Sequence, residues 1–135
     1  MILKRVPITR DEDVTTAVVV IQALAREHGF GHDAIQRLAT AVSELTRNIR
    51  KYCQASDGDV LMSLEERGKG GLRILVQVRD NGPGISDLDK ALEDHYSSSG
   101  TLGLGLPGVR RIVDYFQIVS ELGRGTVVTI GIDWL

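Results

Sequence analysis

Glycines gather in one stretch of the chain, directly before an apolar run with helical spacing. The stretch reads Ser97-Ser98-Ser99-Gly100-Thr101-Leu102-Gly103-Leu104-Gly105-Leu106-Pro107-Gly108 and continues as Val109-Arg110-Arg111. Glycine lets bare backbone come close to a ligand, and the free N–H groups at a helix start favour an anion. The stretch therefore predicts a phosphate-binding loop. The alternative from these residues alone is a flexible loop that ends at Pro107 and Gly108.

Three glycine-rich phosphate motifs fit this stretch to different degrees. Gly103-x-Gly105-x-x-Gly108 has the spacing of a dinucleotide-binding motif, but the polar segment 97–101 before it does not read as a strand. A P-loop needs Gly-Lys-Ser/Thr where this chain has Gly108-Val109-Arg110. The lysine strand and the His-Arg-Asp and Asp-Phe-Gly motifs of ordinary protein kinases do not follow. The rest of the chain has to separate these possibilities.

Composition excludes several classes of protein. The 135 residues are 42% hydrophobic and 25% charged, so we expect a single domain over residues 1–135. A net charge of -2 gives no electrostatic reason to expect binding to nucleic acid or to an acidic membrane. The single cysteine, Cys53, excludes an internal disulfide and suits a cytoplasmic location. No apolar run has the length of a membrane span.

Hydrophobic periodicity predicts alternating strands and helices, and a capping box of Thr9 and Glu12 marks the start of the first helix. This order predicts an α+β two-layer sandwich, an antiparallel sheet with helices on one face. The predicted elements, in chain order, are a strand (2–8), two helices (9–29 and 33–52), two strands (60–64 and 74–78), a polar lid (86–102), a helix (106–115) and two strands (116–120 and 128–134).

Two further groups of polar residues follow from these elements. Glu44, Asn48 and Lys51 lie four and three residues apart, so they share one face of the second helix with Arg37 and Arg47. Taken alone, such a row is typical of a solvated helix face.

Asp80 follows the second hairpin strand and precedes the tight turn Asn81-Gly82-Pro83-Gly84-Ile85. Its carboxylate can therefore point at a ligand from the strand end. The alternative is an ordinary turn aspartate that bonds its own backbone.

The order and separation of these segments resemble the Bergerat-fold (GHKL) ATPases, the superfamily of gyrase, Hsp90, histidine kinases and MutL. Glu44-x-x-x-Asn48-x-x-Lys51 is similar to the N box, and Asp80-x-Gly82-x-Gly84 to the first glycine box. Gly103-x-Gly105-x-x-Gly108 is similar to the second glycine box, and Gly123-x-Gly125-Thr126 to the last. The resemblance implies a two-layer α/β sandwich with a mixed, mostly antiparallel sheet.

Within that superfamily, residues 44–48 and 102–109 look most like the RsbT-type serine kinases of bacterial stress-response partner switching, relatives of the anti-sigma factor kinases. The resemblance implies ATP and Mg²⁺ as ligands. Glu44 would be the general base, Asn48 the Mg²⁺ ligand, and Lys51 would face phosphate. Asp80 would accept a hydrogen bond from the adenine amine. The remaining residues implied in nucleotide binding are Gly82, Gly84, Ile85 and Thr126 around the base and Gly103, Leu104, Gly105 and Gly108 around the phosphates.

The resemblance also implies a function and its partners. It predicts a kinase that phosphorylates a serine of a STAS-domain antagonist, is released from a STAS-domain co-antagonist scaffold (the stressosome), and then activates a PP2C-type phosphatase. The alternative is an anti-sigma factor that sequesters a sigma factor, with ATP gating the interaction. Arg47, Arg110 and Arg111 either steer an acidic partner or are ordinary solvated arginines.

Overall fold

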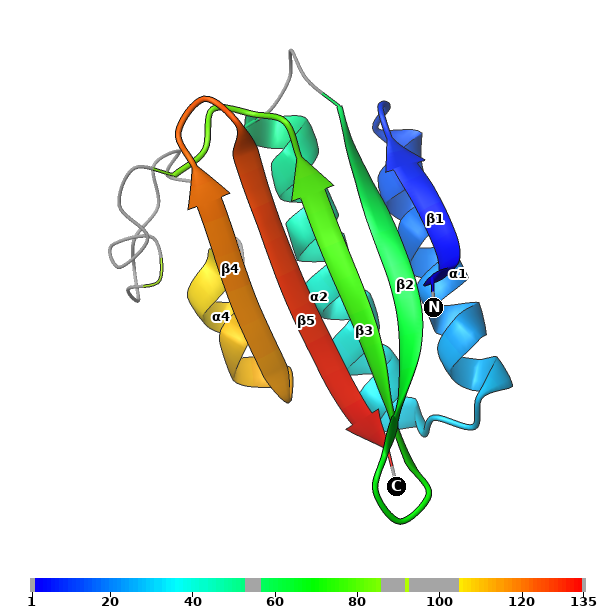
Figure 1. Cartoon of the computed structure of the whole chain (residues 1–135). Helices are drawn as coiled ribbons and strands as arrows, with labels where there is room; N and C mark the ends of the chain where they lie inside the picture. Colours follow the sequence, from blue (N-terminus) through cyan, green and yellow to red (C-terminus); the bar gives the residue numbers. More distant parts are fainter. Residues whose placement is uncertain (1, 53–56, 86–91, 93–104, 135) are drawn as a thin grey trace.

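The structure, a computed structural model, describes residues 2–52, 57–85, 92 and 105–134. Within these ranges the chain forms five strands and three helices (Figure 1). In chain order they are β1 (Ile2–Ile8), α1 (Glu12–Glu27), α2 (His32–Tyr52), β2 (Gly58–Arg67), β3 (Gly71–Asp80), α4 (Gly105–Ile112), β4 (Tyr115–Glu121) and β5 (Gly125–Trp134).

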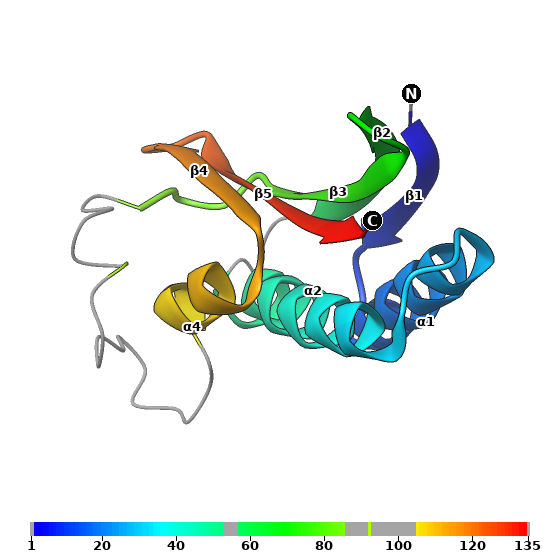
Figure 2. The ribbon, with the colours of Figure 1, turned by 90° about the horizontal axis from the view of Figure 1, so that it is seen from below.

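The five strands make one sheet in the order β1-β2-β3-β5-β4, and every pairing among them is antiparallel. Figure 2 shows the three helices on the same side of this sheet. The predicted α+β two-layer sandwich is therefore confirmed. The described pairings contain no parallel pair, so the sheet is antiparallel rather than mixed over the residues that the structure covers.

Helix α2 lies between the other two helices and supplies much of the core. One apolar stripe of this helix is buried, and each such side chain contributes about 1.5–3 kcal/mol when it leaves water. The stripe packs on the inward-facing residues of the strands, which alternate along each strand with residues of the opposite face. The buried members of the stripe are Ile35, Leu38, Val42, Leu45 and Ile49.

The predicted capping box of the first helix is wrong. Helix α1 begins at Glu12, after Asp11, which makes no side-chain cap. The carboxylate of Asp13 instead accepts hydrogen bonds from the N–H groups of Thr9 and Arg10, at 2.9 and 3.0 Å. These hydrogen bonds hold the pKa of Asp13 below its usual value. The shorter Asp13 side chain thus fixes the approach to the helix, and Glu12 pairs with Arg10.

The last predicted helix also ends earlier than expected, at Ile112 rather than residue 115. The N–H of Asp114 donates to the carbonyl oxygen of Gly131 at 2.9 Å, so the chain has already joined the sheet there. The predicted lid, 86–102, lies outside the described residues apart from Leu92, and it stays a prediction.

A buried carboxylate ties three strands together on the sheet face opposite the helices. Asp59 on β2 is 6% exposed and accepts hydrogen bonds from Arg79 on β3 and from Arg5 on β1, all at 2.8 Å. The hydrogen bonds from Arg79, reinforced by Arg5, hold the pKa of Asp59 below its usual value despite burial. The charged form of Asp59 is therefore the one that stabilises the fold.

We expect Asp59→Asn to lower the free energy of unfolding by about 1–2 kcal/mol at pH 7, because the two guanidinium groups lose a charged acceptor. Since the folded-state pKa lies below the usual aspartate value of 3.8, this contribution is present above that pH and is lost as the pH falls through the folded pKa. Urea denaturation between pH 7 and pH 3 measures it. The exposed Asp57→Asn is the matched control, and a difference from wild type that is as large at pH 3 as at pH 7 would contradict the assignment.

Candidate functional site

One row of residues crosses four strands at the end of the sheet drawn uppermost in Figure 1. Gly58 pairs with Asp80, Asp80 with Thr126, and Thr126 with Ser120. Asp80 lies two residues after the buried core residue Val78 and therefore on the same face of β3, so the row faces the helices. A Cβ atom on Gly58 would meet the Ile49 side chain at 2.9 Å, so α2 packs closely against the row.

Among the described residues, only one of the two carboxylate oxygens of Asp80 accepts a hydrogen bond. Its Oδ1 accepts a hydrogen bond from the N–H of Gly82 at 2.9 Å, as expected for an aspartate that forms a turn. No group in the described part of the chain donates to Oδ2. The sequence suggested either a turn aspartate or a carboxylate that faces a ligand. These interpretations are compatible, because Oδ1 can form the turn while Oδ2 faces a ligand.

The loop after Asp80 docks on the hairpin between β4 and β5. The N–H of Gly123 donates to the carbonyl oxygen of Pro83 at 3.0 Å. Gly84 has φ +80°, and a Cβ there would lie 2.5 Å from the carbonyl oxygen of Glu121. Glycine is therefore required at residue 84 both by its backbone conformation and by the close approach of the hairpin. Gly125, φ +114°, is crowded in the same way by the backbone of Asp80.

Ser120 joins this loop to the row, although no sequence motif predicts it. Its Oγ accepts from the N–H of Ile85 at 2.7 Å and lies 2.7 Å from Oγ1 of Thr126. Its position could have been inferred from the predicted hairpin turn at 123–125. Antiparallel pairing on either side of that turn places Ser120 opposite Thr126.

Glu44 and Gly105 bring the polar face of α2 to the start of α4. The N–H of Gly105, the first residue of α4, donates to Oε1 of Glu44 at 3.0 Å. A helix start attracts negative charge through its free N–H groups and its dipole, so the carboxylate takes the place of an anion there. Two motifs 61 positions apart in the chain therefore meet at one hydrogen bond.

The other polar residues of α2 differ in their exposure to solvent. Asn48 and Lys51 are half-buried, and the Asn48 amide has no hydrogen-bond partner within the ranges that the structure covers. Arg47 is exposed and donates to the hydroxyl of Ser43 at 2.7 Å. The expected solvated face is thus restricted to the side of α2 that carries Arg47.

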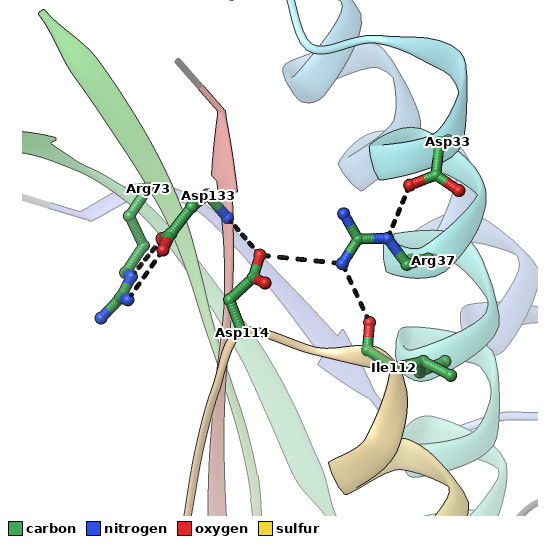
Figure 3. Close-up of polar contacts among 6 residues, drawn as sticks. All are labelled: Asp33, Arg37, Arg73, Ile112, Asp114 and Asp133. Atoms are coloured by element: carbon green, nitrogen blue, oxygen red, sulfur yellow. Dashed lines mark hydrogen bonds and ion pairs between the residues drawn. The ribbon is translucent and has the colours of Figure 1, made fainter.

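Helix α2 also holds the other end of α4, as Figure 3 shows. Nη1 of Arg37 donates to the carbonyl oxygen of Ile112 at 3.2 Å and lies 3.7 Å from Oδ2 of Asp114. Asp114 in turn accepts from the N–H of Asp133, whose carboxylate forms a bidentate pair with Arg73. This pairing holds the pKa of Asp133 below its usual value. Glu44 and Arg37, seven residues apart on α2, therefore contact the first and last residues of α4.

Several predicted residues are placed only in part. Gly103 and Leu104 lie outside the described residues, while Gly108 is buried in the first turns of α4. Arg110 and Arg111 lie exposed on the same helix. The described residues hold no cluster of three or more His, Cys, Asp or Glu side chains able to bind a metal. None of the helices described here is long and apolar enough to cross a membrane.

Known proteins are similar to this chain over most of its length. Residues 33–134 match the family model of the histidine kinase-, DNA gyrase B-, and HSP90-like ATPases. The chain is 43% identical over 131 residues to the serine/threonine-protein kinase RsbT of Bacillus subtilis (strain 168), which covers 96% of this chain and 95% of that protein. It is 29% identical over 128 residues to the anti-sigma F factor of Clostridium beijerinckii, or 91% of this chain and 87% of that one.

A solved structure supports the same fold. The RsbU and RsbW domains of Rv1364c from Mycobacterium tuberculosis match with a TM-score of 0.62 and 20% identity, over 96% of this chain and 32% of that one. At this identity the likeness concerns the fold alone. The family model and the RsbT relative together cover nearly the whole chain. The chain therefore belongs to the histidine kinase-, DNA gyrase B- and HSP90-like ATPase family and, within it, to the RsbT-type serine/threonine-protein kinases.

Proposed function

We propose that this protein transfers the γ-phosphoryl group of ATP to a serine of a STAS-domain antagonist protein. The observation that carries the proposal is the contact between Glu44 and the N-terminal residue of α4, Gly105. It sets a carboxylate beside a helix start suited to phosphate, on the same helix whose Ile49 packs against the row that carries Asp80 and Thr126. A base, a phosphate site and an adenine site are then contiguous.

Asp80 gives this site its preference for adenine. Its unused Oδ2 is an acceptor, and the exocyclic amine of adenine is a donor. Guanine presents a carbonyl oxygen at the same position, which an ionised carboxylate repels. Gly82, Gly84 and Ile85 form the loop beside Asp80, and the hairpin holds this loop in place.

The phosphates belong at the start of α4 in this proposal. The N–H groups of Gly105 and Gly108, with those of Gly103 and Leu104 before the helix, are the donors, and Lys51 faces the same charge. The half-buried Asn48 amide, which has no partner among the described residues, supplies one hard oxygen donor. A single such ligand suits Mg²⁺, which keeps several waters and binds phosphates directly. When bound, Mg²⁺ would offset the phosphate charge.

Glu44 then acts as the general base. The serine Oγ attacks the γ-phosphorus, the bond from that phosphorus to the bridging oxygen of ADP breaks, and ADP leaves. The hydroxyl proton passes to the carboxylate of Glu44. Because the Gly105 N–H now bonded to Glu44 is also a phosphate donor, a bound phosphate would release the carboxylate toward the serine.

The partners are a further part of this proposal. The proposal includes release from a STAS-domain scaffold of the stressosome after phosphorylation, activation of a PP2C-type phosphatase and a cytoplasmic location. Its support is the RsbT relative, which shares 43% of its residues with this chain. The similarity to an anti-sigma F factor favours a second candidate, in which the protein sequesters a sigma factor under control of ATP.

The first experiment follows labelled γ-phosphate from Mg-ATP to a purified STAS-domain protein. We expect labelling of a serine, and a fall of about 10²- to 10⁴-fold in the rate with Glu44→Gln, because the amide cannot take the proton. Glu121→Gln, at an exposed acid of the β4–β5 hairpin, is the matched control. Transfer by Glu44→Gln at the wild-type rate would show that the base lies elsewhere. ATP binding without any transfer would favour the sequestering function.

Calorimetry with ATP tests the adenine site separately. Asp80→Asn should weaken ATP binding at least tenfold, which corresponds to about 1.4 kcal/mol. The asparagine can still hold the Gly82 turn but lacks the charge that favours the adenine amine. Asp57→Asn, at an exposed aspartate near the same sheet end, should bind ATP like wild type. Unchanged affinity in Asp80→Asn would remove Asp80 from the site.

Two glycines with nearly the same backbone angle test the docked loop. Gly84 and Gly123 have φ +80° and +78°, but only at Gly84 would a Cβ meet other atoms within 4 Å. Alanine at either residue carries the strain of a positive φ, about 1–2 kcal/mol. We expect Gly84→Ala to lower both the thermal midpoint and the ATP affinity more than Gly123→Ala does. Equal effects of the two changes would mean that the loop does not depend on contact with the hairpin.

A further inference from the structure

Two oppositely charged side chains of α2 hold the two ends of α4. Nη1 of Arg37 donates to the carbonyl oxygen of Ile112 at 3.2 Å, a contact drawn in Figure 3. Oε1 of Glu44 accepts a hydrogen bond from the N–H of Gly105 at 3.0 Å. Ile112 is the last residue of α4 and Gly105 is the first. The earlier residue of α2 therefore contacts the later end of α4, so the two helices run antiparallel.

The spacing and the signs of the two charges match α4. Arg37 and Glu44 are seven residues apart, and so are Gly105 and Ile112, which corresponds to about 10 Å of helix at 1.5 Å per residue. A cation is favoured at the C-terminal end of a helix and an anion at its N-terminal end. Both contacts therefore stabilise the same position of α4 along α2.

Apolar packing by itself would place α4 less exactly. Val109 is fully buried, and Leu106 and Ile112 pack against the same core. Such contacts are non-directional, so they select the buried face of a helix but resist a small shift along its axis only weakly. A helix of eight residues is also too short to be stable in isolation. The directional hydrogen bonds at its two ends therefore decide where the start of α4 lies.

The contact of Arg37 is anchored to the sheet as well as to α2. Nη1 of Arg37 lies 3.7 Å from Oδ2 of Asp114, and the same oxygen accepts a hydrogen bond from the N–H of Asp133 at 2.8 Å. The N–H of Asp114 donates to the carbonyl oxygen of Gly131 at 2.9 Å. The C-terminal end of α4 is thus joined to α2 and to β5 at once.

The two ends of α4 differ in what ATP would do to them. The Gly105 N–H that bonds to Glu44 is one of the proposed phosphate donors, so a phosphate would replace the carboxylate there. The carbonyl oxygen that Arg37 holds is an acceptor at the opposite end of the helix, and a phosphate does not compete for it. Arg37 can therefore keep α4 against α2 while the start of the helix exchanges one anion for another.

We propose that Arg37 is a positioning residue, which holds α4 by its C-terminal end so that the phosphate-binding start of the helix stays beside Glu44 after ATP has displaced that carboxylate. The inference rests on the proposed binding of ATP and deepens it. It assigns the placement of the phosphate site to a residue outside the motifs named above, at the far end of the helix that binds the phosphate.

Calorimetry with ATP and MgCl₂ tests this role, with the thermal midpoint measured on each protein. We expect Arg37→Gln to weaken ATP binding by about fivefold or more, because the start of α4 loses its fixed position. Arg37→Lys keeps a charged donor for the carbonyl oxygen of Ile112, and it should restore the ATP affinity to within about twofold of wild type.

Arg50→Gln is the matched control on the same helix. Arg50 is half-buried like Arg37, but its Nε pairs with Asp11 at the start of α1, at 3.2 Å, instead of with α4. The same chemical change there removes one helix-to-helix ion pair and should lower the thermal midpoint about as much as Arg37→Gln does. It should leave the ATP affinity unchanged.

Asp114→Ala is a second variant, and it leaves Arg37 in place. It removes the carboxylate that joins Arg37 to β5, so it should also weaken ATP binding. This variant decides the question if Arg37→Gln does not fold.

The outcomes separate this inference from the proposed function. A wild-type protein that does not bind ATP would overturn both. A folded Arg37→Gln protein with wild-type ATP affinity would overturn the inference alone, and so would equal losses of affinity in Arg37→Gln and Arg50→Gln. Wild-type affinity in Asp114→Ala would have the same consequence.

Discussion

The site depends on how α2 divides its surface between the sheet and α4. One stripe of the helix, from Ile35 to Ile49, is buried against the strands and fixes the rotation of the helix about its axis. That rotation turns a second line of residues toward α4. Arg37 then reaches the last residue of α4, and Glu44 reaches the first. The position of the proposed phosphate site is therefore a consequence of core packing on another face of the same helix.

The sequence was sufficient for the elements because each carries a local signal. The 3.6-residue spacing of α2 and the alternation in β2 and β3 survive in the structure, since burial of one face is what both patterns report. The predicted helix ends were wrong where two local sequence signals compete. Asp13 rather than Glu12 holds the approach to α1, and the end of α4 is set by Asp114, which bonds to Gly131 on β5. A partner across the sheet cannot be read from helical spacing.

The candidate site was predictable to the extent that its residues sit in recognisable boxes. Asp80, Gly84 and Thr126 could be named because glycines surround them, and the docked loop explains the need for those glycines. The contact of Glu44 with Gly105 could not be derived locally, since 61 positions separate the two. Ser120 has no motif of its own. Its role arises from strand register, which places it opposite Thr126.

The two halves of the proposed site are held by different kinds of contact. Backbone pairing holds one half, and a side-chain hydrogen bond holds the other. The adenine half rests on the backbone ladders of β3, β5 and β4, which hold Asp80, Thr126 and Ser120 in one row, and on a loop crowded against a hairpin. The phosphate half rests on α4, whose first N–H is held by the side chain of Glu44. A side-chain contact can exchange partners without breaking a sheet, whereas a register shift would move every residue of a strand. We therefore propose that base selection depends on the rigid half, and that the rearrangement which frees Glu44 for chemistry occurs in the half that can exchange its hydrogen bonds.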